Sequence, residues 1–400
     1  MMGRLYKVLR LLILIFSVIG LGIVYLYTVK NHGQWPAIIT LSLMWINPET
    51  IASSHAIEPH MYVLPLFSLS LYYAYKYHIS DALTNDYLPA AIFAGLSIGT
   101  QASSMYIVTP IIISMFLSFY KKSRSYDLLR DLLLYFTVLT IAVLLINPYY
   151  ILNIEGFIQD LNVGLGNQLI IPTSESNYMS VLKNIWAPYQ ISMFLLIMFI
   201  LSIPYNLFIL RNKNTLFYIG IAIPAIAIYL VTGNIMQYIY PSLMVFSLMS
   251  SLMLVSIYKT IHKPSRKYLV IFIIILAILS PVSRSVYYLI NYKYDNRIEA
   301  AEWVNKNIEV GSTIGVTFPP TNYDSIPFRF HKYNLSEIKR AGDTPEYIIL
   351  VNRIIPTDIK ENYKLIKKFT PRSILGYRPI LKGEVAAIYA KIVKIYQKKL

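Results

Sequence analysis

The 400-residue chain is 56% hydrophobic and only 14% charged, whereas soluble domains carry about a quarter charged residues. This composition, with its apolar residues gathered in long runs, excludes an ordinary soluble globular protein. The sequence has no cysteine, which excludes disulfides, thiol catalysis and cysteine-bound zinc. The net charge of +16 is spread over alternate loops and the C-terminal part without a nucleic-acid-binding module, so we expect no nucleic-acid partner.

The apolar runs predict about ten membrane-spanning helices, because a span needs about 20 mostly apolar residues. The first run has a basic start like that of a signal peptide, but its apolar stretch is too long and no small-residue cleavage site follows. The predicted fold is therefore mainly α, with a polytopic helical membrane domain in residues 1–290 and a small α/β domain in residues 291–400. The predicted spans are residues 8–28, 35–52, 60–77, 87–101, 104–120, 131–149, 189–210, 215–232, 236–257 and 268–290.

The loops between these spans alternate in charge. One alternating set carries twelve Lys and Arg residues, and the other carries one, Lys183. Cytoplasmic loops collect Lys and Arg. We therefore predict a multi-pass plasma-membrane protein in which the loops with few basic residues, and everything after residue 290, face the exterior. The same orientation places the basic N-terminus outside, although basic segments usually face the cytoplasm. Three explanations are open: this end is an exception, the first two spans are miscounted, or an upstream span is missing. The twelve basic residues are Lys30, Lys76, Lys121, Lys122, Arg124, Arg130, Arg211, Lys213, Lys259, Lys263, Arg266 and Lys267.

The pattern changes after the last span. Residues 297–308 have apolar positions at helical spacing, namely Ile298, Ala301, Val304 and Ile308. Strand-like runs follow at residues 312–318, 346–352, 363–369 and 386–396, so we expect a small α/β domain. Asn334, Leu335 and Ser336 form an N-glycosylation acceptor triplet, which the predicted exterior location would make available.

Ionisable residues gather in the loop between the second and third predicted spans, which holds Glu49, His55, Glu58 and His60. Ionisable groups at membrane depth are costly and tend to be functional. His55 and Glu58 are three residues apart, so they would share one face of a helical turn. Such a pair can hold a divalent cation, act as a base, or be part of an ordinary polar loop. A metal site needs at least a third ligand, so the cofactor stays open.

Further polar residues fall at the same predicted exterior level. They lie at the end of the fourth span, the end of the sixth span and the start of the ninth. Each is unremarkable alone, because prolines end helices and tyrosines populate membrane interfaces. Their shared depth predicts an exterior cavity that could handle a lipid headgroup. The residues are Gln101, Asn147, Tyr149, Gln237 and Tyr238.

Five stretches of the sequence carry a family resemblance, namely NPETIASSHAIEPHMYVLPLFSLSLYYAYKY, AAIFAGLSIGTQASSMYIVTPI, INPYYILNIEGFIQDL, QYIYPSLMVF and RIEAAEWVNKNIEVGSTIGV. They resemble the GT-C superfamily of polyprenyl-phosphate-sugar glycosyltransferases, which includes protein O-mannosyltransferases and lipid A aminoarabinose transferases. Glu58 stands where this family has an acid, Gln101 where it frequently has Lys, and Gln237 where it has Arg.

The resemblance implies transfer of a sugar from a polyprenyl (dolichyl)-phosphate donor to a hydroxyl of a protein or lipid acceptor at the exterior membrane face. In the family, a carboxylate activates the acceptor hydroxyl, which attacks the anomeric carbon. Polar or cationic groups stabilise the departing polyprenyl phosphate. The catalytic candidates are then Glu58 and His55. The substrate-binding candidates are Gln101, Asn147, Tyr149, Gln237 and Tyr238.

The resemblance also has a gap. In the family, the loop with the main catalytic acid follows an additional first span, and no position in this sequence matches it. The chain is then a truncated enzyme, an enzyme whose partner chain supplies the acidic loop, or a non-catalytic lipid-binding or partner subunit of a membrane complex. A transporter is a further alternative, but the internal repeats that transporters show are not found in the sequence.

Overall fold

The computed structural model divides into two compact units, Met1–Val282 and Ser283–Leu400. The described residues are mainly helical with one small sheet, as the sequence predicts. The structure describes residues 2–47, 50–51, 60–80, 84–122, 125–156, 158, 193–210, 214–231, 240–279, 281–316, 326–338, 345–351, 361–373 and 392–399.

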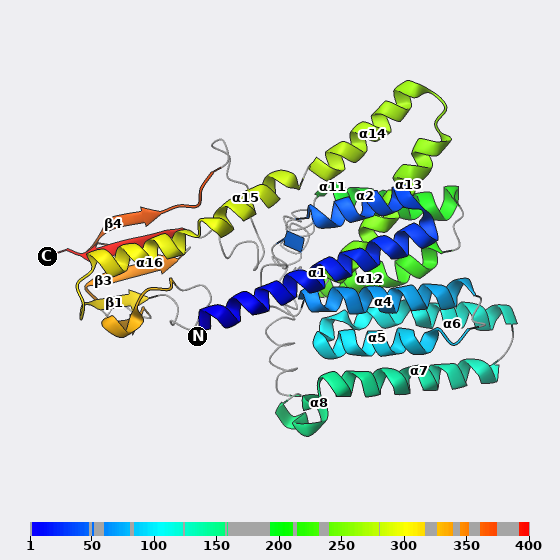
Figure 1. Ribbon diagram of the computed structural model, residues 1–400, viewed down its shortest axis with the longest axis horizontal. Coiled ribbons are helices and arrows are strands. Elements are labelled where there is room, and N and C mark those ends of the chain that lie inside the picture. The colour runs from blue at the N-terminus through cyan, green and yellow to red at the C-terminus, as the bar shows by residue number, and fades with distance from the viewer. Residues whose placement is uncertain are drawn as a thin grey trace. The chain divides into compact units, whose positions relative to one another are not determined.

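The first unit is a helical bundle (Figure 1). Helix α5 packs against both α4 and α7, α1 packs against α2 and α4, and α13 packs against α2 and α11. Gly33 joins α1 to α2 with a φ of 93°, which residues other than glycine rarely adopt. The elements are α1 (Met2–His32), α2 (Gln34–Trp45), α4 (His60–Ile79), α5 (Tyr87–Thr100), the 3₁₀ turn η1 (Ala102–Ile107), α6 (Val108–Lys122), α7 (Ser125–Ile146), α8 (Tyr149–Leu152), α11 (Met193–Pro204), the π-helical turn η2 (Tyr205–Ile209), α12 (Thr215–Val231), the 3₁₀ turn η4 (Tyr240–Ser242), α13 (Leu243–Thr260) and α14 (Pro264–Leu279).

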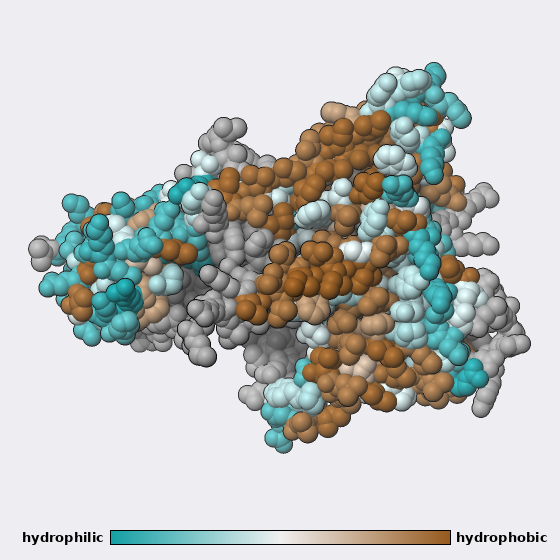
Figure 2. All heavy atoms as spheres, viewed as in Figure 1, coloured by the Kyte–Doolittle hydropathy of each residue, from teal (hydrophilic) through white to brown (hydrophobic). Residues whose placement is uncertain are grey.

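The face of this bundle seen in Figure 2 is largely apolar. Figure 2 shows hydrophobic residues along α1, α7 and α14, with hydrophilic residues gathered at helix ends. Large apolar side chains are exposed on these helices, for example Val18 on α1, Leu145 on α7 and Phe272 on α14. By length and composition, three described helical segments can cross a membrane, namely Leu11–His32, Leu128–Ile146 and Leu243–Thr260, and four further apolar segments are shorter. The total of ten spans stays a prediction.

The tenth predicted span differs from the structure. Residues 268–290 form parts of two helices, because α14 ends at Leu279 and α15 (Val282–Lys293) begins after Pro281. A proline inside a helix lacks the N–H for the backbone hydrogen bond and its ring clashes with the carbonyl four residues earlier. The boundary between the two compact units also falls here, between Val282 and Ser283.

The second unit packs α16 (Asn296–Asn307) on a five-stranded sheet of order β2-β1-β3-β5-β4. Strand β1 pairs in parallel with β2 and β3, whereas β5 pairs antiparallel with β3 and β4. Of the four apolar positions at helical spacing, Ala301, Val304 and Ile308 are buried, whereas Ile298 is 51% exposed; Ala300 is also buried. The strands are β1 (Thr313–Val316), β2 (Asn334–Glu337), β3 (Tyr347–Val351), β4 (Tyr363–Phe369) and β5 (Val393–Lys398).

Strand β2 carries the predicted glycosylation triplet and was not expected as a strand. It lies at one edge of the sheet, where Asn334 pairs with Thr313 and Ser336 with Gly315. The Asn334 side chain donates a hydrogen bond from Nδ2 to the Gly311 carbonyl at 2.9 Å. The acceptor amide is thus already engaged with the backbone of a neighbouring turn.

Candidate functional site

Two glycines bring α5 and α7 into close contact. A β-carbon built on Gly95 would lie 2.5 Å from the Leu139 carbonyl oxygen, and one on Gly99 would lie 2.9 Å from both the Val143 carbonyl oxygen and the Ile146 β-carbon. Small residues four apart let membrane helices approach closely. The contacts advance along both helices in the same direction, so the two helices are parallel. The C-terminal ends of α5 and α7, with Gln101 and Asn147, therefore lie at the same end of the bundle.

Gln101 ends α5 and is 9% exposed. Its backbone is extended, with φ −151° and ψ 105°, and its N–H donates to the Ser97 carbonyl at 2.9 Å. The Gln101 carbonyl accepts from both the N–H and the hydroxyl of Ser104, at 2.9 and 2.8 Å. The Ser97 hydroxyl in turn donates to Ser104 Oγ at 2.9 Å. Two serines thus fix the backbone of Gln101 at the point where α5 gives way to η1.

Tyr106 adds a second buried polar group to this end. It lies on η1 and is 2% exposed. Its ring packs against Phe67 of α4, with centroids 5.5 Å apart. Its hydroxyl lies beside Ser242 of η4, and Ser242 is fully buried. The elements η1 and η4 both contact α4 and α12, so the hydroxyls of Tyr106 and Ser242, from separate segments, meet inside the bundle.

Sequence inspection missed Ser97, Ser104, Tyr106 and Ser242. Hydroxyl side chains in apolar helices usually bond to a carbonyl of the preceding turn, so single serines carry little signal. The available signal was the polar run Thr100-Gln101-Ala102-Ser103-Ser104 between two apolar stretches.

Asn147 and Tyr149 lie just after α7. The Asn147 N–H donates to the Val143 carbonyl at 2.9 Å, and its carbonyl accepts from Tyr150 at 3.4 Å. Tyr149 starts α8, is 38% exposed, and its hydroxyl lies over Gly156, where a β-carbon would be only 2.5 Å away. The neighbouring Asn153 Oδ1 accepts the Gly156 N–H at 3.1 Å. Tyr149 therefore packs on the turn that follows it.

The catalytic candidates His55 and Glu58 lie outside the described residues, as do Gln237 and Tyr238. Asn47 and Thr50, after α2, are 1% and 3% exposed, and α4 begins at His60. Tyr77 of α4 packs against Tyr87 of α5, and Tyr73 packs against Phe93, so the two helices are antiparallel. The start of α4 therefore lies at the same end of the bundle as Gln101.

Within the part of the chain that the structure describes, no group of three or more His, Asp or Glu side chains could hold a metal ion. His55 and Glu58 lie outside this part. The described polar side chains named above, such as Gln101, Tyr106 and Asn147, carry amides or hydroxyls, which can donate hydrogen bonds to an anionic oxygen.

Comparison with known proteins gives one family match. Residues 1–151 match the family model of the dolichyl-phosphate-mannose-protein mannosyltransferases. This range includes His55, Glu58, Gln101, Asn147 and Tyr149. No curated protein matches the chain.

Two solved structures align with most of the chain. The crystal structure of ArnT from Cupriavidus metallidurans in the apo state aligns with 9% identity and a TM-score of 0.47, covering 96% of this chain and 83% of that one. The structure of the same protein bound to undecaprenyl phosphate aligns with 10% identity and a TM-score of 0.46, covering 97% and 83%. The family match confirms the resemblance to the GT-C superfamily that the sequence motifs carry: residues 1–151 are similar to its dolichyl-phosphate-mannose-protein mannosyltransferases.

Proposed function

We propose that this chain transfers a sugar from a polyprenyl-phosphate carrier to a hydroxyl group of a protein or lipid acceptor at the exterior face of the plasma membrane. The observation that carries the proposal is the match of residues 1–151 to the dolichyl-phosphate-mannose-protein mannosyltransferases. The name of that family states a lipid-phosphate sugar donor and a protein acceptor. The matched range also contains most of the polar residues that stand out from the apolar helices.

The geometry around Gln101 supports a site for the phosphate of the donor. Burying polar groups in an apolar bundle is costly, so such groups are usually retained for a specific role. The Gln101 amide can donate to phosphate oxygens, and its backbone is held by Ser97 and Ser104. Donors fixed in advance stabilise charge that develops on a leaving group. Asn147, at the same end of the bundle, is a second amide within this proposal.

The proposed chemistry is a single displacement at the anomeric carbon. Since no residue of this sequence matches the family's main catalytic acid, we assign its role to Glu58. This carboxylate accepts the proton of the acceptor hydroxyl, and the hydroxyl oxygen forms the new bond to the anomeric carbon. The bond between that carbon and the phosphate oxygen breaks, and the electron pair leaves with the polyprenyl phosphate. His55 contacts the acceptor or the phosphate. The exterior location rests on the loop charges, with twelve Lys and Arg in one set and one in the other.

The role of Glu58 is tested with Glu58→Gln, which keeps the size of the side chain and removes the base. Purified chain in liposomes receives a radiolabelled polyprenyl-phosphate mannose and a serine-containing peptide, and release of polyprenyl phosphate is measured. We expect Glu58→Gln to lower turnover by about 100-fold or more, since a general base contributes at least that much. The matched control is Glu155→Gln, a change at an exposed carboxylate of the C-terminal end of the matched region, which should leave turnover unchanged.

A non-catalytic lipid-binding subunit is the second candidate function. The observation that favours it is the neutral Gln101 and Gln237 at positions where the superfamily frequently has Lys and Arg. Under this alternative, the chain binds polyprenyl phosphate but releases none from the sugar-linked donor, and Glu58→Gln changes neither property.

A further inference from the structure

The turn between α13 and α14 is short and strongly basic. We refer to residues 259–268 as the basic turn. Helix α13 ends at Thr260 and α14 begins at Pro264. The Ile261 N–H donates to the Ile257 carbonyl at 3.2 Å, and the Lys263 carbonyl accepts from Arg266 and Lys267 at 3.1 and 3.2 Å. These bonds hold four cations on one tight bend, namely Lys259, Lys263, Arg266 and Lys267.

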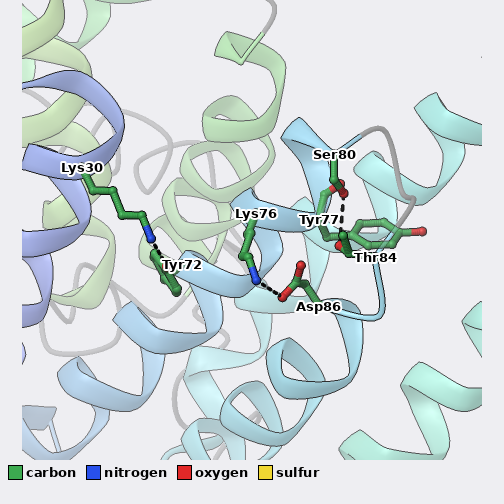
Figure 3. A network of polar contacts seen from close by, with 7 residues as sticks. All are labelled: Lys30, Tyr72, Lys76, Tyr77, Ser80, Thr84 and Asp86. Atoms are coloured by element: carbon green, nitrogen blue, oxygen red, sulfur yellow. Dashed lines mark hydrogen bonds and ion pairs between the residues drawn. The ribbon is translucent and has the colours of Figure 1, made fainter.

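The positive charge of the basic turn is not balanced by acidic residues nearby in the sequence. Between residues 240 and 294 the chain has no Asp or Glu, and within the described residues none of the four cations forms an ion pair. Other basic side chains of the bundle do have partners (Figure 3). Lys76 pairs with Asp86 at 2.8 Å, and Lys30 donates to the Tyr72 hydroxyl at 2.7 Å.

The position of the basic turn along its helices matches the boundary between membrane and water. Leu243–Thr260 is a candidate membrane span, so Lys259 lies at its end. Tyr258 and Tyr268 flank the bend and are 38% and 71% exposed, as expected of tyrosines at a membrane interface. The Lys267 ammonium lies 5.3 Å from the centroid of the Tyr258 ring, a cation–π contact across the bend. Hydrophilic residues mark the tip of this helix pair beside the apolar surface of α14 (Figure 2).

We propose that the basic turn binds the headgroups of anionic phospholipids. The four cations supply the charge that an anionic headgroup requires, at the depth where headgroups lie. The exposed apolar side chains that follow on α14, including Leu269, Phe272 and Leu276, can pack against the acyl chains of the same lipid. This pairing of charge with apolar surface favours a lipid over a free anion or a soluble polyanion. Each Lys or Arg near a charged membrane surface strengthens binding by about fivefold.

The test places a fluorescent reporter at the bend. Trp35, Trp45, Trp186 and Trp303 are replaced by Phe, and Tyr268→Trp provides a single tryptophan. The full-length chain is reconstituted in liposomes that contain brominated phosphatidylglycerol or brominated phosphatidylcholine, whose bromine quenches nearby tryptophan. We expect phosphatidylglycerol to be preferred at the reporter by at least about fivefold. Changing Lys259, Lys263, Arg266 and Lys267 to Gln together should remove the preference, and each single change should lower it.

The matched control removes four charges elsewhere, with Lys364, Lys367, Lys368 and Lys398 changed to Gln in the second unit, and it should retain the preference. The single variants Lys263→Gln and Arg266→Gln keep the test decisive if the fourfold variant does not fold. An equal affinity for the two lipids in the parent would overturn the proposal, as would a fourfold variant that keeps the preference. Loss of the preference on adding inorganic phosphate, but not chloride of equal ionic strength, would also overturn it, because the turn would then be a free-anion site.

Discussion

Gly95 lies directly against the backbone of Leu139, and a β-carbon on Gly95 would be 2.5 Å from the Leu139 carbonyl oxygen. Gly95→Ala should therefore push α5 and α7 apart and destabilise the bundle by about 1–3 kcal/mol, as overpacking of a close contact does. Thermal unfolding of the purified chain in detergent measures this. Gly22→Ala is the control, because nothing lies within 4 Å of a β-carbon there. A Gly95→Ala chain as stable as the parent would contradict the close packing of α5 and α7.

Tyr218 connects α12 to α1 through two hydrogen bonds of its hydroxyl. The oxygen lies 2.7 Å from the Tyr27 hydroxyl and 2.7 Å from His32 Nε2, and both tyrosines are 1% exposed. Tyr218→Phe leaves the buried Tyr27 and the partly buried His32 without that hydroxyl, so we expect a loss of about 1–3 kcal/mol in thermal unfolding. Tyr268→Phe, at a side chain that is 71% exposed, should have no measurable effect. If the two changes altered the stability equally, the hydrogen bonds of the Tyr218 hydroxyl would not stabilise the bundle.

Asp295 and Arg297 form a buried ion pair at the start of α16. Arg297 Nη2 lies 2.6 Å from Asp295 Oδ2, and the Arg297 backbone N–H donates to Asp295 Oδ1 at 3.0 Å. Asp295→Asn leaves the guanidinium buried without its counter-charge, which should cost about 3–5 kcal/mol. Urea unfolding followed by Trp303 fluorescence measures the change, since Trp303 packs against the core of the second unit.

Two further variants distinguish the effect of a buried ion pair from that of an exposed one. Glu299 and Arg372 form an ion pair at 3.2 Å with side chains that are 48% and 50% exposed, so Glu299→Gln should cost less than about 1 kcal/mol. Replacing Asp295 and Arg297 together by Leu should recover most of the stability that Asp295→Asn loses, because no buried charge remains. A double variant that is less stable than Asp295→Asn would refute this explanation.

Alkaline pH should destabilise the second unit. Burial raises the pKa of Tyr363 and of Tyr396, and burial raises the pKa of Tyr333 against the opposing effect of Arg329. A raised folded-state pKa means that the unfolded chain ionises first, so stability is complete below the ordinary value of about 10 and is lost as pH rises through the folded-state values. Urea unfolding of a chain with Trp303 as its only tryptophan, at about pH 8 and about pH 11, should show the loss. Changing the three tyrosines to Phe should reduce the loss, and an unchanged pH dependence would contradict the assignment.

Much of the helical fold could be predicted from hydropathy, because a long apolar run can satisfy its backbone in lipid only as a helix. The predicted fourth span, residues 87–101, corresponds to α5 (Tyr87–Thr100). Pro281 within the tenth apolar run was the signal that a helix ends there. Strand β2 could not be predicted in the same way. Its residues, Asn334–Glu337, contain no β-branched or aromatic side chain, and their strand conformation comes from parallel pairing with β1.

The candidate site was only partly predictable. Gln101 stood out because an amide interrupts two apolar runs, and the structure places it, buried, at the same end of the bundle as Asn147. The contact that brings the two ends together depends on Gly95 and Gly99 facing Leu139 and Ile146, which requires knowing which helices are neighbours. The serines that hold Gln101 carry no periodic signal, because their role is set by the break between α5 and η1.

The central claim is that this chain moves a sugar from a polyprenyl phosphate to a hydroxyl group. The most direct measurement gives the purified, unsubstituted chain in liposomes a polyprenyl-phosphate mannose with labelled sugar and labelled lipid, together with a hydroxyl-bearing peptide. The account predicts that labelled sugar appears on the peptide and labelled polyprenyl phosphate is released in equal amounts. Retention of both labels on the intact donor, in a chain that still binds it, would contradict the account and identify a lipid-binding subunit instead.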